Sequence, residues 1–253
     1  MPIALVRMKT NFGFQKVKEE EKEPKVQEVF SNVAERYDIM NDLMSFGLHR
    51  IWKDSFIKEV GSFDGKELID LAGGTGDIAR RFIDMGGKNV TVCDLNQNML
   101  KNGKFNIGNK FNKRYTRDIK WVHANAEELP FADESFDYCT ISFGIRNVTH
   151  VNNVLEESFR VLKPGGKFLC LEFSKVENSF VSRIYDAYSF KFIPKIGKLV
   201  THSESSYRYL VESIRQFYHP EELAKMMRDV GYYSVNFRRL SFGVVAIHTG
   251  YKV

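Results

Sequence analysis

One stretch constrains the fold of this chain more than any other. Residues 68–82 read LIDLAGGTGDIARRF, with glycines between a short apolar run and an amphipathic segment. Glycine adopts positive φ and lets a ligand approach the backbone closely, so the stretch predicts a strand, a ligand-binding turn and a helix. Two ligands fit such a turn. Gly74-x-Gly76-x-x-Ala79 satisfies the dinucleotide fingerprint, and the same turn could hold S-adenosyl-L-methionine (AdoMet).

Strands and helices alternate along most of the remaining chain. Apolar runs of strand length occupy residues 67–71, 89–95, 119–126, 136–144 and 166–174. Helical segments separate these runs, and strands connected in this way form a parallel sheet with right-handed crossovers. Two further runs, 233–240 and 244–253, are joined by SFG and predict a closing antiparallel hairpin. The predicted fold is α/β, with a Rossmann-like sheet of seven strands that is parallel except for this hairpin.

We expect a single domain over residues 26–253 of this 253-residue chain, after a flexible N-terminus at 1–25. Apolar residues recur at helical spacing from Val26, which predicts a helical extension over 26–60. The aromatic, basic stretch 176–218 is predicted to be a helical lid inserted beside the sheet. The first eighteen residues are basic and contain no acid, so they resemble the remnant of an organelle presequence.

Composition excludes several classes of protein. With 43% hydrophobic and 27% charged residues, the chain has an ordinary globular composition. A net charge of +5 is compatible with anionic substrates or an anionic membrane surface, but it is too small to argue for nucleic acid. Cys93, Cys139 and Cys170 lack the spacing of metal ligands and are predicted to be buried apolar residues, so we expect no metal site. No apolar run approaches the ~20 residues that span a bilayer.

Acidic and amide residues after the strands favour AdoMet over a nicotinamide dinucleotide. Asp77 opens the helix after the turn, where it would also cap that helix. A carboxylate there suits the cationic ammonium and sulfonium of AdoMet but would repel a pyrophosphate. Asp94 ends the second strand and could accept both ribose hydroxyls, a feature that both cofactors share. Asn125 and Ala126 follow the third strand, where they could bond the adenine ring. Asp70 either contacts the cofactor or supports the turn from behind.

Three longer stretches carry a family resemblance: RYDIMNDLMSFGLHRIWK (36–53), SFGIRNVTH (142–150) and SYRYLVESI (206–214). With AGGTGD they resemble the ubiquinone/menaquinone-biosynthesis C-methyltransferases, especially their eukaryotic mitochondrial branch, from about residue 12 to the C-terminus. The resemblance implies a class I AdoMet-dependent methyltransferase. It also implies methyl transfer to a ring carbon of a polyprenylated methoxy-benzoquinol.

The predicted site residues follow from this chemistry and from the resemblance. A hydroquinone carbon is a weak nucleophile until a ring hydroxyl loses its proton, so the protein must align the reactants and polarise that hydroxyl. We interpret Arg146 as stabilising the phenolate and holding a water that Asn147 orients; the alternative is an Arg146 salt bridge that orders the loop. Tyr37 either bonds the cofactor or quinol or packs in the lid. The predicted cofactor-binding residues are Asp70, Gly73, Gly74, Thr75, Gly76, Asp77, Asp94, Leu95, Asn125, Ala126 and Ser142.

The resemblance further implies a mitochondrial protein at the matrix face of the inner membrane, peripherally attached and part of a complex of ubiquinone-biosynthesis proteins. It leaves a homodimer open. Residues 181–200, with Lys191, Lys195 and Lys198, either line a tunnel for the isoprenoid tail and face anionic headgroups or form an ordinary lid helix. The chain departs from the family pattern at Thr201–Glu204 and within 214–223, notably over Tyr218–Glu221, so tail length and quinol positioning stay open.

Two other functions stay open on the sequence alone. The dinucleotide fingerprint leaves an NAD-dependent oxidoreductase as the first alternative. The second is a non-catalytic scaffold that uses the fold to support a quinone-synthesis complex. Intact Asp94, Arg146 and Asn147 argue against the scaffold.

Overall fold

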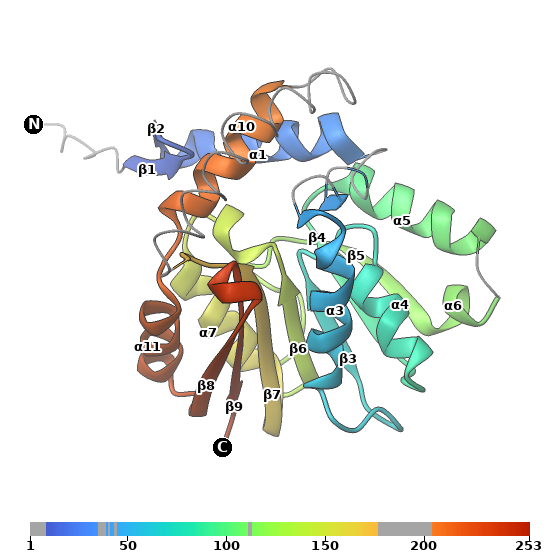
Figure 1. Ribbon diagram of the computed structural model, residues 1–253. Coiled ribbons are helices and arrows are strands. Elements are labelled where there is room, and N and C mark those ends of the chain that lie inside the picture. Colours follow the sequence, from blue (N-terminus) through green and yellow to red (C-terminus); the bar gives the residue numbers. More distant parts are fainter. Residues whose placement is uncertain (1–8, 35–38, 40, 43–44, 111–112, 177–203) are drawn as a thin grey trace, which may run out of the picture.

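The computed structural model describes residues 9–34, 39, 41–42, 45–110, 113–176 and 204–253 (Figure 1). Its centre is a seven-stranded sheet in the order β5-β4-β3-β6-β7-β9-β8. The strands are β3 (Leu68–Leu71), β4 (Val90–Asp94), β5 (Ile119–His123), β6 (Phe136–Ser142), β7 (Leu162–Phe173), β8 (Tyr233–Leu240) and β9 (Val245–Tyr251). The pairs among β3 to β7 are parallel, whereas β9 runs antiparallel to both β7 and β8. The predicted sheet and its closing hairpin are thereby confirmed.

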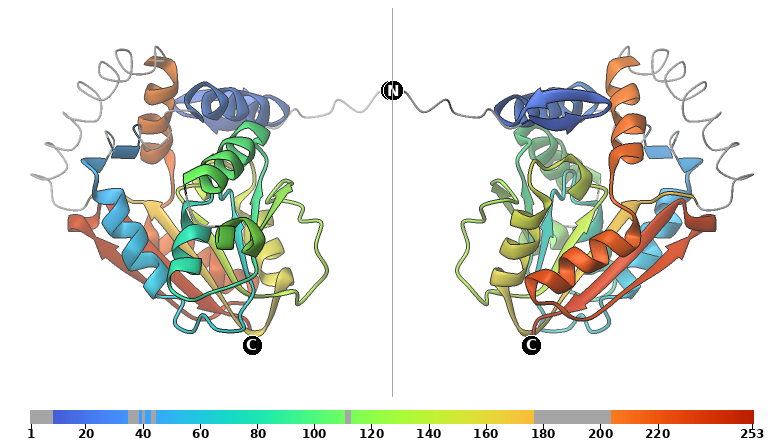
Figure 2. Two further views of the ribbon diagram at one scale, coloured as in Figure 1. Left: turned by 90° about the vertical axis from the view of Figure 1, so that its right-hand side faces the viewer. Right: turned by 90° about the vertical axis from the view of Figure 1, so that its left-hand side faces the viewer.

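Helices cover both faces of the sheet (Figure 2). One core contains Phe56 and Phe82 from the helices α3 (Leu48–Lys58) and α4 (Asp77–Asp84). The other contains Leu155 and Met227 from α7 (Val151–Val161) and α11 (Pro220–Val230). Alternate strand residues face these two cores, since side chains in a strand point to opposite faces in turn. The sheet is further flanked by α5 (Gln97–Lys110) and α6 (Lys113–Asp118), and the single turns are η2 (Ile145–Asn147) and η4 (Ser241–Gly243).

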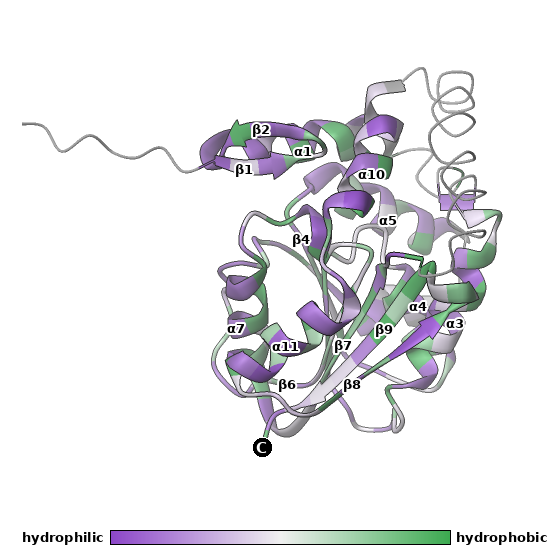
Figure 3. Cartoon of the chain, turned by 60° about the vertical axis from the view of Figure 1, so that its left-hand side comes forward, coloured by the Kyte–Doolittle hydropathy of each residue, from purple (hydrophilic) through white to green (hydrophobic). Residues whose placement is uncertain are grey.

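Local chemistry explains where several of these elements begin and end. Gly47 has φ 74° and is the N-cap of α3, a left-handed conformation that glycine adopts without strain. Pro220 starts α11, and Gly231 ends it at φ 117°. The edge strand β8 carries hydrophilic residues, whereas its neighbour β9 is buried and largely hydrophobic (Figure 3). No helix in the part of the chain that the structure describes is long and apolar enough to cross a membrane.

The N-terminal region differs from the prediction. Residues 9–18 form a hairpin of β1 (Lys9–Phe12) and β2 (Gln15–Lys18), and helix α1 (Glu19–Val33) follows at once. The predicted flexible segment at 1–25 is therefore wrong over 9–25. The acidic run Glu19–Glu21 forms the first turn of this helix, where the positive end of the helix dipole stabilises its carboxylates.

A cap of N-terminal and lid elements lies over the carboxyl ends of the parallel strands (Figure 1). It consists of the hairpin, α1 and α10 (Glu204–Gln216), and Phe12 of the hairpin stacks on Tyr209 of α10 with ring centroids 4.3 Å apart. Of the predicted lid at 176–218, residues 177–203 lie outside the described part. The segment 181–200 with its lysines, and Thr201 to Ser203, therefore stay sequence-based expectations.

Candidate active site

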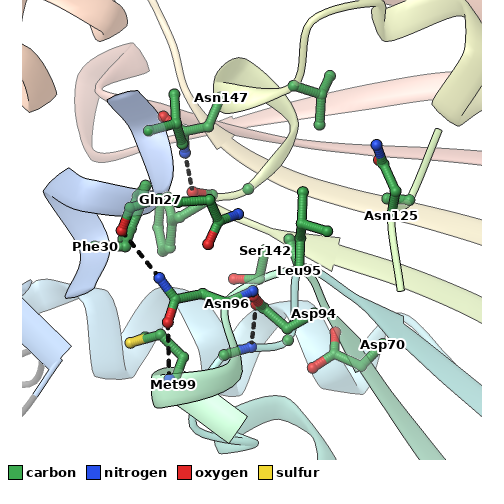
Figure 4. A pocket seen from close by; sticks show the side chains of 18 of the residues that line it. Gln27, Phe30, Asp70, Asp94, Leu95, Asn96, Met99, Asn125, Ser142 and Asn147 are labelled. Carbon is green, nitrogen blue, oxygen red and sulfur yellow. Dashed lines mark hydrogen bonds between the residues drawn. The ribbon is translucent and has the colours of Figure 1, made fainter. Parts of the chain in front are cut away.

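A pocket lies between the carboxyl ends of β3, β4 and β6 and the helix α1 (Figure 4), and its empty space together with the solvent at its open side is about 1000 Å³. This is the sheet edge at which ligands bind in open α/β folds. Its wall contains ten of the predicted cofactor-binding residues, so sequence positions far apart meet here. They are Asp70, Gly73, Gly74, Thr75, Asp77, Asp94, Leu95, Asn125, Ala126 and Ser142.

The glycine turn brings the backbone of Gly73 and Gly74 to the wall of the pocket. Gly74 has φ 55°. A Cβ on Gly73 would lie 2.7 Å from the Asp70 Oδ2 atom and 2.9 Å from Val92, so that position excludes every other residue. Gly76 has a different role, because it lies outside the pocket wall and a Cβ there would meet the Trp121 ring at 2.7 Å. The prediction that Gly76 binds cofactor is therefore not supported by its position, and we assign it to packing.

Asp94 is held rigidly at the end of β4. Its Oδ2 atom accepts the N–H of Gly74 at 2.8 Å, and its Oδ1 atom accepts the N–H of Asn96 at 2.7 Å. Each carboxylate oxygen keeps a further lone pair for a ligand hydroxyl. Burial raises the pKa of Asp94 to about 6, against the lowering effect of the two backbone bonds.

Asp70 and Ser142 each present an unsatisfied polar atom inside the pocket wall. The Asp70 Oδ1 atom accepts the Thr140 hydroxyl at 2.8 Å, but its Oδ2 atom is buried and has no hydrogen-bond partner among the described residues. The Ser142 hydroxyl is likewise buried and unpaired within that part of the chain. Burial raises the pKa of Asp70 to about 7. Buried polar groups are normally paired, and because both residues line the pocket, these atoms are available to a ligand bound there.

Asp77 is not the free carboxylate that the sequence argument assumed. Its carboxylate contacts Lys53 at 2.9 Å and Arg80 at 3.4 Å, and it also accepts a bond from Arg81. Burial alone would raise the pKa of Asp77, but Lys53 and Arg81 outweigh it and hold that pKa well below the usual range. Asp77 is also the first residue of α4, with Gly76 as the N-cap and no side-chain cap bond. The expected capping role is wrong.

The helix α1 closes the outer side of the pocket through amide contacts. Asn96 donates to the Gln27 carbonyl at 3.1 Å and to the Ser31 hydroxyl at 3.0 Å. Asn125 donates to Glu23 at 3.2 Å while its oxygen accepts the N–H of Glu127 at 2.9 Å. The predicted adenine partner Asn125 therefore links α1 to the pocket rim, and one N–H of its amide is left for a ligand.

The loop after β6 carries both predicted catalytic residues, but only one of them lines the pocket. Asn147 lines the pocket; its amide oxygen accepts the Tyr209 hydroxyl at 3.1 Å, and its nitrogen lies 3.4 Å from the Phe143 carbonyl. Arg146 lies outside the pocket wall and is 8% exposed. It donates to Glu172 at 2.8 Å and to the Phe143 carbonyl at 2.7 Å. This geometry favours the alternative, a salt bridge that orders the loop. Tyr37 lies outside the described residues.

Sequence reasoning missed several residues on both sides of the pocket. On the side of α1 they are Glu23, Val26, Gln27 and Phe30, and on the side of the sheet they are Asn96, Met99 and Phe143. Sequence reasoning also missed Lys53, a buried cation that lines the pocket. The helical spacing of Val26 and Phe30 signalled a buried face but could not identify what that face covers. Among the described residues, no three His, Cys, Asp or Glu side chains are grouped to hold a metal ion.

Sequence comparison identifies close relatives of this chain. The model of the ubiE/COQ5 methyltransferase family matches residues 16–252. The mitochondrial 2-methoxy-6-polyprenyl-1,4-benzoquinol methylases of Bos taurus and Homo sapiens are each 46% identical to this chain, over 96% of it and 84% of their own length. The enzyme of the same name from Xenopus laevis is 45% identical, over 98% of this chain and 90% of its own.

Solved structures with the same fold are more distant in sequence. A SAM-dependent methyltransferase from Thermotoga maritima has a TM-score of 0.62 at 19% identity, over 90% of this chain and 100% of its own. One from Aquifex aeolicus has a TM-score of 0.59 at 18% identity, over 88% and 98% of the two chains. These likenesses confirm the predicted class I methyltransferase fold.

Proposed function

Because this chain belongs to the ubiE/COQ5 methyltransferase family and is an AdoMet-dependent C-methyltransferase, we propose that it methylates a ring carbon of 2-methoxy-6-polyprenyl-1,4-benzoquinol in ubiquinone biosynthesis. The observation that carries this substrate is the 46% identity over 96% of the chain to enzymes named for that reaction. None of the relatives and structures described above is a nicotinamide-dependent oxidoreductase, so the dinucleotide alternative gains no support.

The pocket fits AdoMet on two structural observations. The Asp70 Oδ2 and Ser142 hydroxyl atoms lack partners in the described chain, which suits a ligand with cationic and hydrogen-bonding groups. Gly73 and Gly74 line the pocket, so a ligand can lie against the backbone of the turn with no side chain of these two residues between them. In this proposal Asp94 accepts the ribose hydroxyls, and Asn125 with the Ala126 backbone bonds the adenine. When bound, AdoMet supplies an electrophilic methyl on a cationic sulfur.

The remaining task of the protein is to align the quinol and help its hydroxyl lose a proton. Asn147 is suited to this because Tyr209 holds its oxygen and Phe143 lies beside its nitrogen. An amide has two N–H groups and two acceptor lone pairs, so one of each remains to orient a hydroxyl or water in the pocket. Arg146 acts in this proposal by holding the loop that carries Asn147. A contact of Tyr37 with the cofactor or quinol stays a prediction.

We further propose a mitochondrial location, with peripheral attachment at the matrix face of the inner membrane and membership of a ubiquinone-biosynthesis complex, in which a homodimer is one possible arrangement. The names of the relatives support the mitochondrial part. An excess of five positive charges suits an anionic membrane surface, and a polyprenyl tail gives the substrate itself a reason to reside in lipid.

The test is an assay with a short-tailed methoxy-benzoquinol and methyl-labelled AdoMet, with the product examined by mass spectrometry. We expect one labelled methyl on a ring carbon, with S-adenosylhomocysteine formed in equal amount. Asn147→Ala should bind AdoMet as the wild type does but transfer the methyl far more slowly. Label on a hydroxyl oxygen, or no transfer by protein that binds AdoMet, would reject the proposed substrate chemistry.

A further inference from the structure

Lys53 of α3 is a charged residue that the proposal above leaves without a role. It is 5% exposed and lines the pocket. Its ammonium lies 2.9 Å from the Asp77 Oδ2 atom. Burying an ammonium is costly unless anions and acceptors surround it, so a lysine in this place needs more than ordinary packing to explain it.

Of the three cations that contact Asp77, Lys53 has the fewest carboxylate partners in the described part of the chain. Asp77 shares its single carboxylate with three cations, but two of them have a second carboxylate: Arg81 reaches Asp54 at 2.7 Å, and Arg80 reaches Asp84 at 2.7 Å. For Lys53, Asp77 is the one ion-pair partner within the described chain. An ammonium carries three N–H donors, so Lys53 keeps donors for an anion in the pocket.

The same wall also offers an unmatched acceptor. Asp70 is 1% exposed, and its Oδ2 atom has no partner among the residues described. Asp70 and Lys53 interact electrostatically across this region. The pocket is therefore lined by an ammonium with N–H donors to spare and by a carboxylate with an unpaired oxygen. This pair complements a zwitterion, and the α-amino acid end of AdoMet is a zwitterion.

We propose that Lys53 binds the α-carboxylate of the methionine moiety of AdoMet, while Asp70 faces its ammonium. This inference rests on AdoMet as the cofactor of the site but not on the identity of the quinol. Lys53 thereby makes the pocket selective for cofactors that keep the carboxylate, which the glycine turn and Asp94 alone would not do.

The test compares the affinity of the full chain for AdoMet and for decarboxylated AdoMet by isothermal titration calorimetry. Wild-type protein should bind AdoMet at least tenfold more tightly. Lys53→Met should weaken AdoMet about 10- to 100-fold, as expected for a lost charge-assisted bond, and leave decarboxylated AdoMet nearly unchanged. Lys53→Arg keeps the charge and should keep most of the preference.

Arg81→Met is the matched control, because Arg81 also bonds Asp77 but does not line the pocket. It should change the affinity for both ligands by the same factor. A wild-type protein that binds the two ligands equally overturns the proposal without any variant. Equal weakening of both ligands by Lys53→Met also overturns it, since Lys53 would then act through Asp77. Tight, carboxylate-dependent binding without methyl transfer to a quinol would instead reject the proposed substrate alone.

Discussion

Replacing Arg146 tests whether this residue acts on the substrate or on the loop that carries Asn147. Arg146 and Glu172 are 8% and 1% exposed, and their charged atoms lie 2.8 Å apart. The Glu172 carboxylate also accepts the backbone N–H of Phe173 at 2.8 Å. Burial raises the pKa of Glu172, against the opposing effect of Arg146. The pair is therefore a buried salt bridge inside the fold.

Arg146→Met should destabilise the protein strongly because it leaves a buried carboxylate without its cation. Breaking one side of a buried pair costs about 3–5 kcal/mol. In a chain of this size each kcal/mol lowers Tm by roughly 2–4 °C, so we expect a fall of roughly 6–20 °C. Arg146→Met with Glu172→Met removes both charges and should recover most of that stability. Thermal denaturation followed by circular dichroism measures both changes.

Turnover of the double variant then identifies the role of Arg146. If Arg146 acts by ordering the loop, the double variant should regain a substantial part of the turnover that Arg146→Met loses, with the KM for AdoMet close to that of the wild type. A double variant that is as stable as the wild type but more than a hundredfold slower would show that the guanidinium acts on the quinol. A single variant within 1 kcal/mol of the wild type would refute the reasoning from burial.

Two further predictions concern residues around the pocket. Tyr209→Phe removes the hydroxyl that holds the Asn147 oxygen, so it should lower kcat several-fold and leave the Kd for AdoMet unchanged. Tyr232→Phe is the control, because it removes a buried hydroxyl bonded to Ser158 at 2.8 Å. Each variant should lose ~1 kcal/mol of stability, but Tyr232→Phe should not change kcat. Equal kcat effects in the two variants would argue against a positioning role. Burial raises the pKa of Asp70 to about 7, so the folded state holds this proton more tightly than the unfolded chain, and Asp70 destabilises the fold increasingly as pH rises from about 4 to 7. Asp70→Asn should therefore gain stability relative to the wild type over that interval and level off above it, and a pH-independent difference in denaturant titrations would contradict this.

The sheet could be predicted closely from the sequence because its signals are local and strong. Buried parallel strands are short apolar runs, and glycine or proline ends the helices between them. The strand predicted at 136–144 is found at Phe136–Ser142, and the run predicted at 233–240 is found at Tyr233–Leu240. The hairpin at residues 9–18 was missed because its strands are four residues long and its alternation is mostly polar. Such a hairpin is stabilised by what it packs on, here Tyr209 of α10, which lies about 200 positions away in the sequence.

The difference between local signals and packing of distant segments also explains which site residues could be predicted. Residues at the ends of parallel strands must meet at one edge of the sheet, so the sequence places Asp70, Asp94 and Ser142 together without further information. The partners of a charged side chain follow no such rule. Asp77 reads as a free acid in the sequence, yet helix packing brings Lys53 onto its carboxylate. The acidic character of the pocket therefore depends less on Asp77 than on Asp70 and Asp94. Within the described chain no lysine or arginine contacts the carboxylate of Asp70 or Asp94 directly, so these two acids stabilise a cationic ligand most.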